Sequence, residues 1–164
     1  MPRQSATVVI EFCCDEASSI GDRASHHDIQ KVRLSVARGN ILDDKYFCSV
    51  ITELGKLQTE GFEIKLWGSV PCTPWTSWQR LAIANHPPKY KKELEGRRIR
   101  SRNLIRRFTF LSEIINSGGG ASVFEWPRHC DGWTDPEIAT LLGEQQWHTA
   151  DVDGCSLGVK SAKS

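Results

Sequence analysis

The sequence predicts an α/β fold, with a Rossmann-like, doubly wound and mostly parallel sheet in a single domain. Short β-branched and aromatic runs alternate with helix-periodic segments along most of the chain, which is typical of a parallel sheet covered by helices. A length of 164 residues suits one well-buried core and is short for two. No internal repeat is present, so we assign residues 6–158 to the domain and residues 1–5 and 159–164 to tails.

The first three predicted strands lie before residue 71. Residues 6–13 (ATVVIEFC) are a β-branched and aromatic run bounded by polar residues, which predicts a buried strand. The polar and small residues of 15–22 predict a loop after it. Residues 32–36 (VRLSV) alternate apolar and polar side chains and predict the second strand, and residues 62–70 (FEIKLWGSV) predict the third.

A helix is predicted between the second and third strands. Asp43 or Asp44 can cap its start, and Gly61 can end it. Its apolar side chains recur at helical spacing at Phe47, Val50, Ile51, Leu54 and Leu57. We expect Cys48 to be buried with this stripe, because a free cysteine often packs as a small apolar residue.

The second half of the chain opens with a predicted loop. Residues 73–88 carry three of the seven prolines and show no clean period, and long loops in compact domains are usually functional. A helix is expected from about Lys89 to the run Ser117-Gly-Gly-Gly120. Its apolar residues Leu104, Phe108, Leu111 and Ile115 recur at steps of three and four.

Three further elements complete the prediction. Residues 121–125 (ASVFE) predict a strand. The segment Thr134-Asp-Pro-Glu137 matches a capping box with proline in the first turn, so we expect a helix through Leu142 that Gly143 ends. Residues 147–153 predict a final short strand.

Composition excludes several classes of protein. The apolar content of 39% and charged content of 25% are those of an ordinary globular protein rather than a disordered one. No apolar run approaches the roughly 18 to 20 residues of a membrane-spanning helix. The start Met1-Pro-Arg shows no apolar leader, so we expect an intracellular protein, in cytoplasm or nucleus, with free thiols and no disulfides.

The net charge of +1 conceals an asymmetry. Residues 89–107 hold nine basic and two acidic side chains, which leaves the rest of the chain at −6. Such a run is either a solvated helix face or a surface that follows phosphates, and both interpretations remain open. The candidate nucleic-acid contacts within it are Arg97, Arg98, Arg100, Arg102 and Arg106.

Chemically reactive residues follow the ends of the predicted strands. In a parallel sheet of this type, ligands bind outside the carboxyl ends of the strands. The sequence therefore predicts that these residues converge on one edge. Besides two residues discussed next, they are Cys13, Cys14, Pro71, Thr73, Pro127, Arg128, His129, Cys130, Asp153 and Cys155.

Cys72 and Glu125 are the candidate catalytic residues. Cys72 stands next to a proline directly after a strand, where its thiolate could face a pocket, although an inert thiol in a turn is the alternative. Trp75, Trp78 and Gln79 follow it and could stack on bases or read their edges. Glu125 ends a strand among aromatic residues, where burial can raise the pKa of a carboxyl group enough for it to donate a proton, or it could serve a structural hydrogen bond.

Three segments in this order resemble motifs of the DNA cytosine-5 methyltransferases. They are Glu11-Phe12-Cys13-Cys14 with Ser18 to Gly21, Gly68-Ser-Val-Pro-Cys72, and Val123-Phe-Glu125. The chain is also similar to uncharacterised methyltransferase-like domains of retrotransposon-type polyproteins. That likeness rests on Pro71-Cys72-Thr73 with Ser77 and Gln79, on Glu125-Trp126-Pro127, and on Asp153-Gly154-Cys155 through Gly158. It spans about residues 8–158, and because the family continues beyond that point, a truncated domain is an open alternative to a complete one.

The resemblance implies a Rossmann-like fold that binds S-adenosylmethionine over the loop after the first strand. The implied cofactor residues are Glu11, Phe12, Cys13, Cys14, Ser18 and Gly21. Cys72 would attack C6 of a pyrimidine and Glu125 would hydrogen-bond or protonate N3, so that C5 accepts a methyl group. A base in a duplex must be flipped out for this chemistry, and Trp75 and Trp78 could supply stacking surface.

Two other functions remain open. The first is a nucleic-acid-binding module that keeps the fold, the basic helix and the aromatic residues but has lost catalysis. The second is a metal site, in which His26, His27, His129 and several thiols would meet around zinc. The cysteine spacing matches no zinc motif, so we assign no metal ligand.

Overall fold

The computed structural model describes residues 6–16, 18, 20, 29–86, 88–143 and 147–152. Its centre is a sheet of four parallel strands, which confirms the predicted Rossmann-like α/β class. The strands are β1 (Thr7–Phe12), β2 (Gln30–Leu34), β3 (Glu63–Gly68) and β4 (Ala121–Phe124), in the spatial order β2-β1-β3-β4. β2 begins and ends two residues earlier than the sequence pattern predicts.

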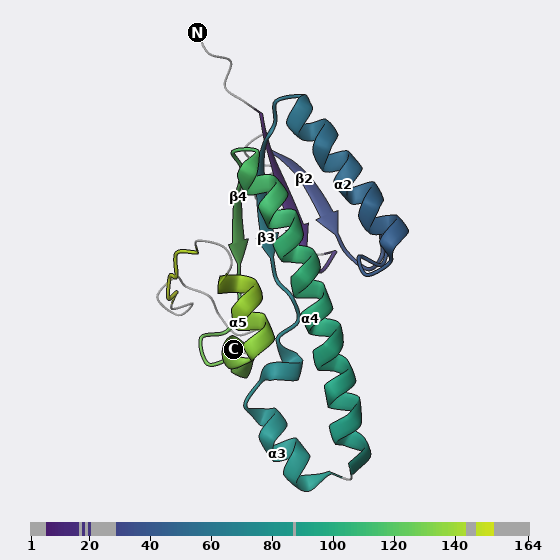
Figure 1. The fold of residues 1–164 in the computed structure, drawn as a ribbon, viewed down its shortest axis with the longest axis vertical. Helices are drawn as coiled ribbons and strands as arrows, with labels where there is room; N and C mark the ends of the chain where they lie inside the picture. Colours follow the sequence, from purple (N-terminus) through teal and green to yellow (C-terminus); the bar gives the residue numbers. More distant parts are fainter. Residues whose placement is uncertain are drawn as a thin grey trace.

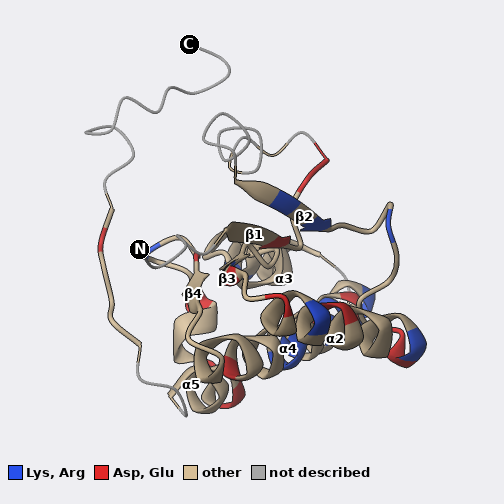
Figure 2. Ribbon diagram, turned by 90° about the horizontal axis from the view of Figure 1, so that it is seen from above, with Lys and Arg blue, Asp and Glu red and all other residues tan. Residues whose placement is uncertain are grey.

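The order in which the chain adds strands to the sheet reverses between β1 and β3. The chain goes from β1 to β2 on one side, and then crosses to β3 and β4 on the other. A ligand crevice is expected outside the carboxyl ends of β1 and β3, because connections on either side of such a reversal leave in opposite directions. Figure 2 shows the helices α2 (Asp44–Thr59), α4 (Pro88–Ser117) and α5 (Pro136–Gly143) together on one face of the sheet.

Helix α2 follows its predicted signals closely. The Asp43 carboxylate accepts a hydrogen bond from the Tyr46 amide at 2.9 Å and caps the start. Gly61 ends the turn after the helix with φ +83°, a conformation that glycine adopts without steric cost. The predicted stripe packs inward at Phe47, Val50 and Leu54, but Cys48 is exposed, so the expectation that it is buried was wrong.

Helix α4 spans 30 residues and runs antiparallel to the strands (Figure 1). Its inner half, residues 101–117, lies on the sheet, and its outer half, residues 88–100, extends past the carboxyl ends of the strands (Figure 1). Phe108 anchors the inner half, because its ring meets Phe12 at 5.7 Å and Phe124 at 5.3 Å. A Cβ at Gly68 would lie 2.5 Å from that ring, so glycine permits the contact. Within the described chain, we find no helix with the length and apolar character that crossing a membrane requires.

The predicted loop over residues 73–88 is largely helical. It contains the short 3-10 turn η1 (Thr73–Trp75) and the helix α3 (Trp78–Asn85). Of the prolines that suggested a loop, Pro74 lies inside η1 and Pro88 begins α4, so neither interrupts α3, and Pro87 lies outside the described residues. α3 and the outer half of α4 form a helical hairpin at the far end of the molecule (Figure 1).

Two predictions near the carboxyl terminus need correction. The cap of α5 is Asp135, whose carboxylate accepts from the Ile138 amide at 3.2 Å, whereas Thr134 belongs to the 3-10 turn η2 (Asp131–Thr134) and donates to the Asp131 carbonyl. Residues 147–152 form no strand, and Trp147 instead stacks on Phe108 at 6.1 Å. β4 is therefore the edge strand on that side of the sheet among the described residues.

Candidate active site

The loops that follow β1, β3 and β4 meet at one end of the sheet, which we call the carboxyl edge. The Ser69 amide donates to the Phe12 carbonyl at 3.1 Å and joins the ends of β3 and β1. The Glu125 amide donates to the Gly68 carbonyl at 2.9 Å and joins the ends of β4 and β3. The predicted convergence of Cys13, Cys72 and Glu125 on one edge therefore holds, whereas Gly21, Asp153 and Cys155 lie outside the described residues.

Cys72 lies at the start of η1 and is half-buried. Its carbonyl accepts from the Trp75 amide at 2.8 Å, which fixes the turn that carries the thiol. The buried Cys130 thiol lies beside the same turn and donates to the Trp75 carbonyl at 3.8 Å. Burial raises the pKa of Cys130, and the nearby Cys72 adds to this shift, so Cys130 is a neutral thiol next to the candidate nucleophile.

Glu125 is exposed at the end of β4. The burial among aromatic residues that the sequence suggested is therefore absent, because the carboxylate points away from the core while its neighbours pack inward. Its Oε2 accepts from the Ser69 hydroxyl at 3.4 Å, and that hydroxyl accepts from Trp67 Nε1 at 3.1 Å. The Trp126 indole also donates to the Val70 carbonyl at 2.6 Å, so two side-chain contacts tie the Glu125 loop to the Cys72 loop.

The turn after β1 is made by two cysteines rather than glycines. Cys13 has φ +59°, a left-handed conformation that is uncommon for a residue with a side chain. Burial raises the pKa of Cys13 to about 12, Cys14 adds to the shift, and the charge of Arg100 opposes it. Burial also raises the pKa of Cys14, with a further contribution from Glu11, and its thiol donates to the Glu11 carbonyl at 3.6 Å. Both are therefore neutral thiols near pH 7 rather than reactive thiolates.

Glu11 and Phe12 do not face a ligand. Phe12 is fully buried against α4, and Glu11 is 1% exposed and forms an ion pair with Arg33, its partner in register on β2, at 3.1 Å. The Ser18 hydroxyl donates to the same carboxylate. The implied cofactor roles of these three residues are thus not supported by their geometry, because their groups are used within the protein.

Arg33 is a residue that the sequence reading missed. Beyond its ion pair, it donates to the carbonyls of Glu16 at 2.7 Å and Ser18 at 2.6 Å, and so holds the loop after β1 in place. The signal was available, since a glutamate inside an otherwise apolar strand requires a buried partner. Glu16 itself is exposed and accepts a hydrogen bond from Ser35, directly after β2.

Of the predicted base-reading residues, only Trp78 is on the surface, with 74% of its area exposed. Trp75 is 3% exposed, donates to the Ser101 hydroxyl at 2.9 Å and contacts Trp126 in the core. Gln79 is also buried, and its side-chain amide group donates to the Thr73 carbonyl and accepts from the Tyr90 hydroxyl, so it is not available to a base. Trp75 and Gln79 were therefore predicted wrongly as contacts for a base.

The basic run divides into paired and unpaired side chains. Arg102 is 18% exposed and pairs with Glu95 and Asp135, each at 2.9 Å, so it holds α4 to its surroundings and was wrongly predicted as a nucleic-acid contact. Arg106 is exposed and pairs with Glu137, and its contact with nucleic acid stays a prediction. Arg98 donates to the Pro74 carbonyl at 3.2 Å and lies over the Trp75 ring. Arg97 and Arg100 remain exposed on the outer half of α4.

The remaining predicted edge residues are mostly at the surface. The exposed ones are Pro71, Thr73, Pro127, Arg128 and His129. Arg128 pairs with Asp151 at 3.4 Å. In the part of the chain that the structure describes, no three histidine, cysteine or acidic side chains lie close enough to hold a metal ion, and His26 and His27 lie outside that part.

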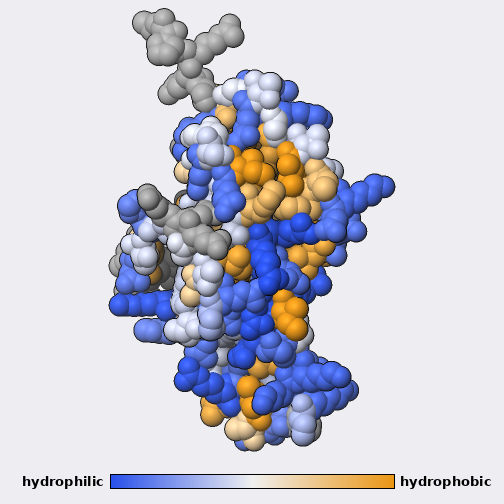
Figure 3. Space-filling view, in the orientation of Figure 1, coloured by the Kyte–Doolittle hydropathy of each residue, from blue (hydrophilic) through white to orange (hydrophobic). Residues whose placement is uncertain are grey.

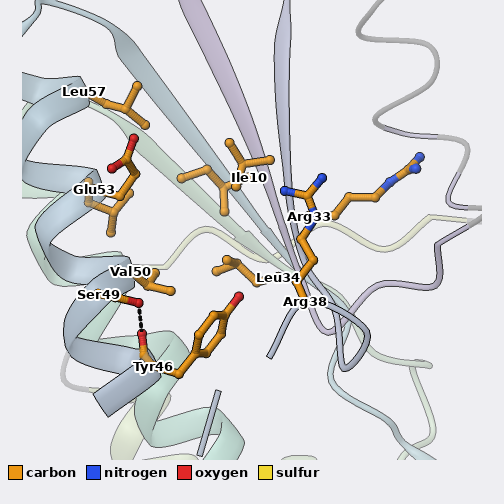
Figure 4. Close-up of a pocket in the computed structure, with 11 residues that line it drawn as sticks. Ile10, Arg33, Leu34, Arg38, Tyr46, Ser49, Val50, Glu53 and Leu57 are labelled. Atoms are coloured by element: carbon orange, nitrogen blue, oxygen red, sulfur yellow. Dashed lines mark hydrogen bonds between the residues drawn. The ribbon is translucent and has the colours of Figure 1, made fainter. Parts of the chain in front are cut away.

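A cavity of about 300 Å³ lies between α2 and the β1–β2 side of the sheet (Figure 4). Ile10, Leu34 and Val50 form part of its apolar wall, and Figure 4 shows the Tyr46 ring directed into it. A second hollow, of about 630 Å³, lies between α2 and α4 beside Phe47. Neither is lined by Cys72 or Glu125, so both are separate from the carboxyl edge.

No family model, curated protein or solved structure matches this chain.

Proposed function

We propose that this chain is a methyltransferase-type domain that acts on a pyrimidine base of a nucleic acid at the carboxyl edge. The observation that carries the proposal is the placement of Cys72 and Glu125 on adjacent loops, after β3 and β4, beside the point where the strand order reverses. A nucleophile and a carboxyl group that share this edge are the two groups that pyrimidine C5 chemistry requires. The tie between Ser69 and Glu125 supports a fixed relation between the two loops.

Two features fit the nucleoside part of S-adenosylmethionine. The left-handed backbone at Cys13 turns the chain sharply after β1, as a cofactor loop requires. The exposed Glu16 carboxylate, oriented by Ser35 after β2, can accept hydrogen bonds from ribose hydroxyls. When bound, the cofactor would supply the methyl group.

The protein's own residues would act on the base. The Cys72 sulfur, as thiolate, adds to C6, and the Glu125 carboxyl group would hydrogen-bond or protonate N3 and so stabilise the negative charge that develops on the ring. The electron pair released to C5 would take up the methyl group, with the electrons of the broken sulfur–methyl bond left on the cofactor. Loss of the C5 proton to water and departure of the Cys72 thiolate restore the C5–C6 double bond and the free nucleophile.

The proposal is tested by the transfer of a tritiated methyl group to a cytosine-containing oligonucleotide. We expect Cys72→Ser to abolish transfer, while cofactor binding, followed by calorimetry, is unchanged. Cys48→Ser removes an exposed thiol on α2 and serves as the control. Glu125→Gln should lower the rate by about 100-fold or more. If Cys72→Ser retains wild-type transfer, Cys72 is not the nucleophile.

A nucleic-acid-binding module without catalysis is the second candidate. One observation favours it: Arg33 and Glu11 hold the loop after β1 by internal contacts, and buried thiols occupy the turn where glycines would allow close approach of a cofactor. In that case S-adenosylmethionine would cause no thermal shift, while an oligonucleotide would still bind with steep salt dependence.

A further inference from the structure

The helical hairpin of α3 and the outer half of α4 is a braced projection. The Tyr90 hydroxyl donates to Gln79 Oε1 at 2.6 Å and joins the first turn of α4 to the first turn of α3. At the base, the Trp75 indole donates to Ser101 at 2.9 Å, and Arg98 donates to the Pro74 carbonyl. One of these polar contacts is buried and two are partly buried, and together they brace the hairpin beyond the carboxyl edge (Figure 1).

Large apolar side chains lie on the outside of this hairpin. Trp78 is 74% exposed and Leu81 is 56% exposed, and their spacing of three residues places them on the same face of α3. Ile99 on α4 is 51% exposed. Single exposed apolar residues are common, but an indole that contributes so little to the core of the protein is unusual, since a tryptophan normally buries most of its large surface.

Exposed cations lie on the other arm of the hairpin, the outer half of α4. Lys91, Lys92 and Arg100 are exposed and form no hydrogen bond or ion pair with any other residue that the structure describes, and Arg97 only covers the Tyr90 ring at 5.5 Å. At the bottom of Figure 3, hydrophilic side chains cover most of this end of the molecule, with hydrophobic ones among them. These cations belong to the basic run at residues 89–107, while the rest of the chain carries a net charge of −6.

We propose that the outer surface of the hairpin binds single-stranded nucleic acid, with Trp78 stacked on a base and Lys91, Lys92, Arg97 and Arg100 on phosphates. Stacking on an indole requires an open base face, which a single strand offers and the interior of a duplex does not. An acidic peptide would satisfy the cations but would gain nothing specific from the indole ring.

The charge of Arg100 acts on the Cys13 thiol at the end of β1, so the cationic surface reaches the carboxyl edge. The inference deepens the proposed function and rests on it for the delivery of a base to Cys72. Strand binding itself requires neither Cys72 nor a cofactor.

The test is fluorescence anisotropy of the full chain with a fluorescein-labelled dT20 oligonucleotide over a range of salt concentrations. We expect Trp78→Ala to weaken binding by about 5- to 100-fold with little change in the salt slope. The triple variant Lys91→Ala, Lys92→Ala and Arg100→Ala should reduce the slope of log K against log salt by about 2, since each phosphate contact on a single strand contributes about 0.7. Lys45→Ala, which removes an exposed cation on α2, is the control.

Wild-type affinity in Trp78→Ala, or equal competition by polyglutamate, would overturn the inference. The binding and methyl-transfer measurements together distinguish failure of this inference from failure of the proposed function. Binding that depends on Trp78 without any methyl transfer retains the inference and rejects the enzyme. Methyl transfer with unchanged KM in Trp78→Ala retains the enzyme and rejects the hairpin as its substrate-binding surface.

Discussion

The two halves of α4 both carry basic residues but have different environments. Each half holds several basic residues, and in the sequence they form one continuous charged run. In the inner half, Arg102, Arg106 and Arg107 pair with acidic side chains of the rest of the protein, including Asp135, Glu137 and Asp44. In the outer half, Lys91, Lys92 and Arg100 have no such partner among the described residues.

The difference shows that charge density along a helix does not locate a binding surface. A basic side chain contributes to an external field only if no internal carboxylate neutralises it. The inner half lies against the acidic residues of α5 and the start of α2, whereas the outer half projects past the sheet (Figure 1). Four single variants of α4 test this contrast below, and those that should change stability most come first.

Shortening a buried side chain in the inner half of α4 should lower the free energy of unfolding more than any other change described below. Phe108→Ala removes a fully buried ring that contacts Phe12, Phe124 and Trp147, so we expect a loss of about 3–5 kcal/mol in the free energy of unfolding. Ile99→Ala in the outer half should change it by less than about 0.5 kcal/mol. Urea denaturation measures both, and similar losses for the two would mean that the outer half is also part of the core.

Arginines of the two halves should also differ. Arg102 is 18% exposed and Asp135 is 10% exposed, so Arg102→Ala leaves a mostly buried carboxylate without its partner and should cost about 2 kcal/mol. Arg100→Ala should cost almost nothing. Urea denaturation distinguishes these outcomes, and an equal cost for both arginines would remove the contrast.

The ion pair between Arg102 and Asp135 predicts that stability depends on pH. Burial by itself would raise the pKa of Asp135, but hydrogen bonds from Arg102 and the Ile138 amide outweigh it and lower the pKa below its ordinary value of 3.8. Because the pKa is lower in the folded state, the stabilisation is complete above about pH 4 and is lost as the pH falls through the folded value. Unfolding measured between pH 2 and 6 should show this loss in the wild type, and Arg102→Ala should weaken it; an identical pH profile for the variant would contradict the assignment.

The smallest effect concerns Cys13. The charge of Arg100 lowers the pKa of this thiol against the larger effect of burial, so Arg100→Ala should slow its alkylation at pH 9 by about twofold, because the thiolate fraction falls. Mass spectrometry of iodoacetamide-treated protein follows each cysteine, with exposed Cys48 as the internal reference. An unchanged rate would mean that the outer half does not influence the carboxyl edge.

Local pattern predicted much of the fold because the relevant forces act between near neighbours. The Asp43 cap, the Gly61 turn and the apolar stripe of α2 depend on residues within a few positions of one another. α3 was missed because its flanking prolines mark the ends of helices as readily as loops. The strand at residues 147–152 was wrong because a strand forms only beside a partner, and its residues carry no information about that partner.

The candidate site also has features that the sequence predicted and features that it did not. Convergence of Cys13, Cys72 and Glu125 followed from the sequence, because parallel strands bring their carboxyl ends to one edge whatever the details of packing. The exposure of each side chain did not follow. Trp75 and Trp78 stand three residues apart in the chain, yet one is buried under α4 and the other is on the surface.

The sequence by itself determined the parallel α/β class, the order of most elements and the edge that carries the cysteine and the glutamate. The tertiary structure decided which charges and aromatic rings remain available to a partner. Burial and ion pairing depend on contacts between residues far apart in the chain, such as Arg102 with Asp135 and Glu11 with Arg33. Those contacts exist only after the sheet and its helices have packed, so no local pattern could specify them.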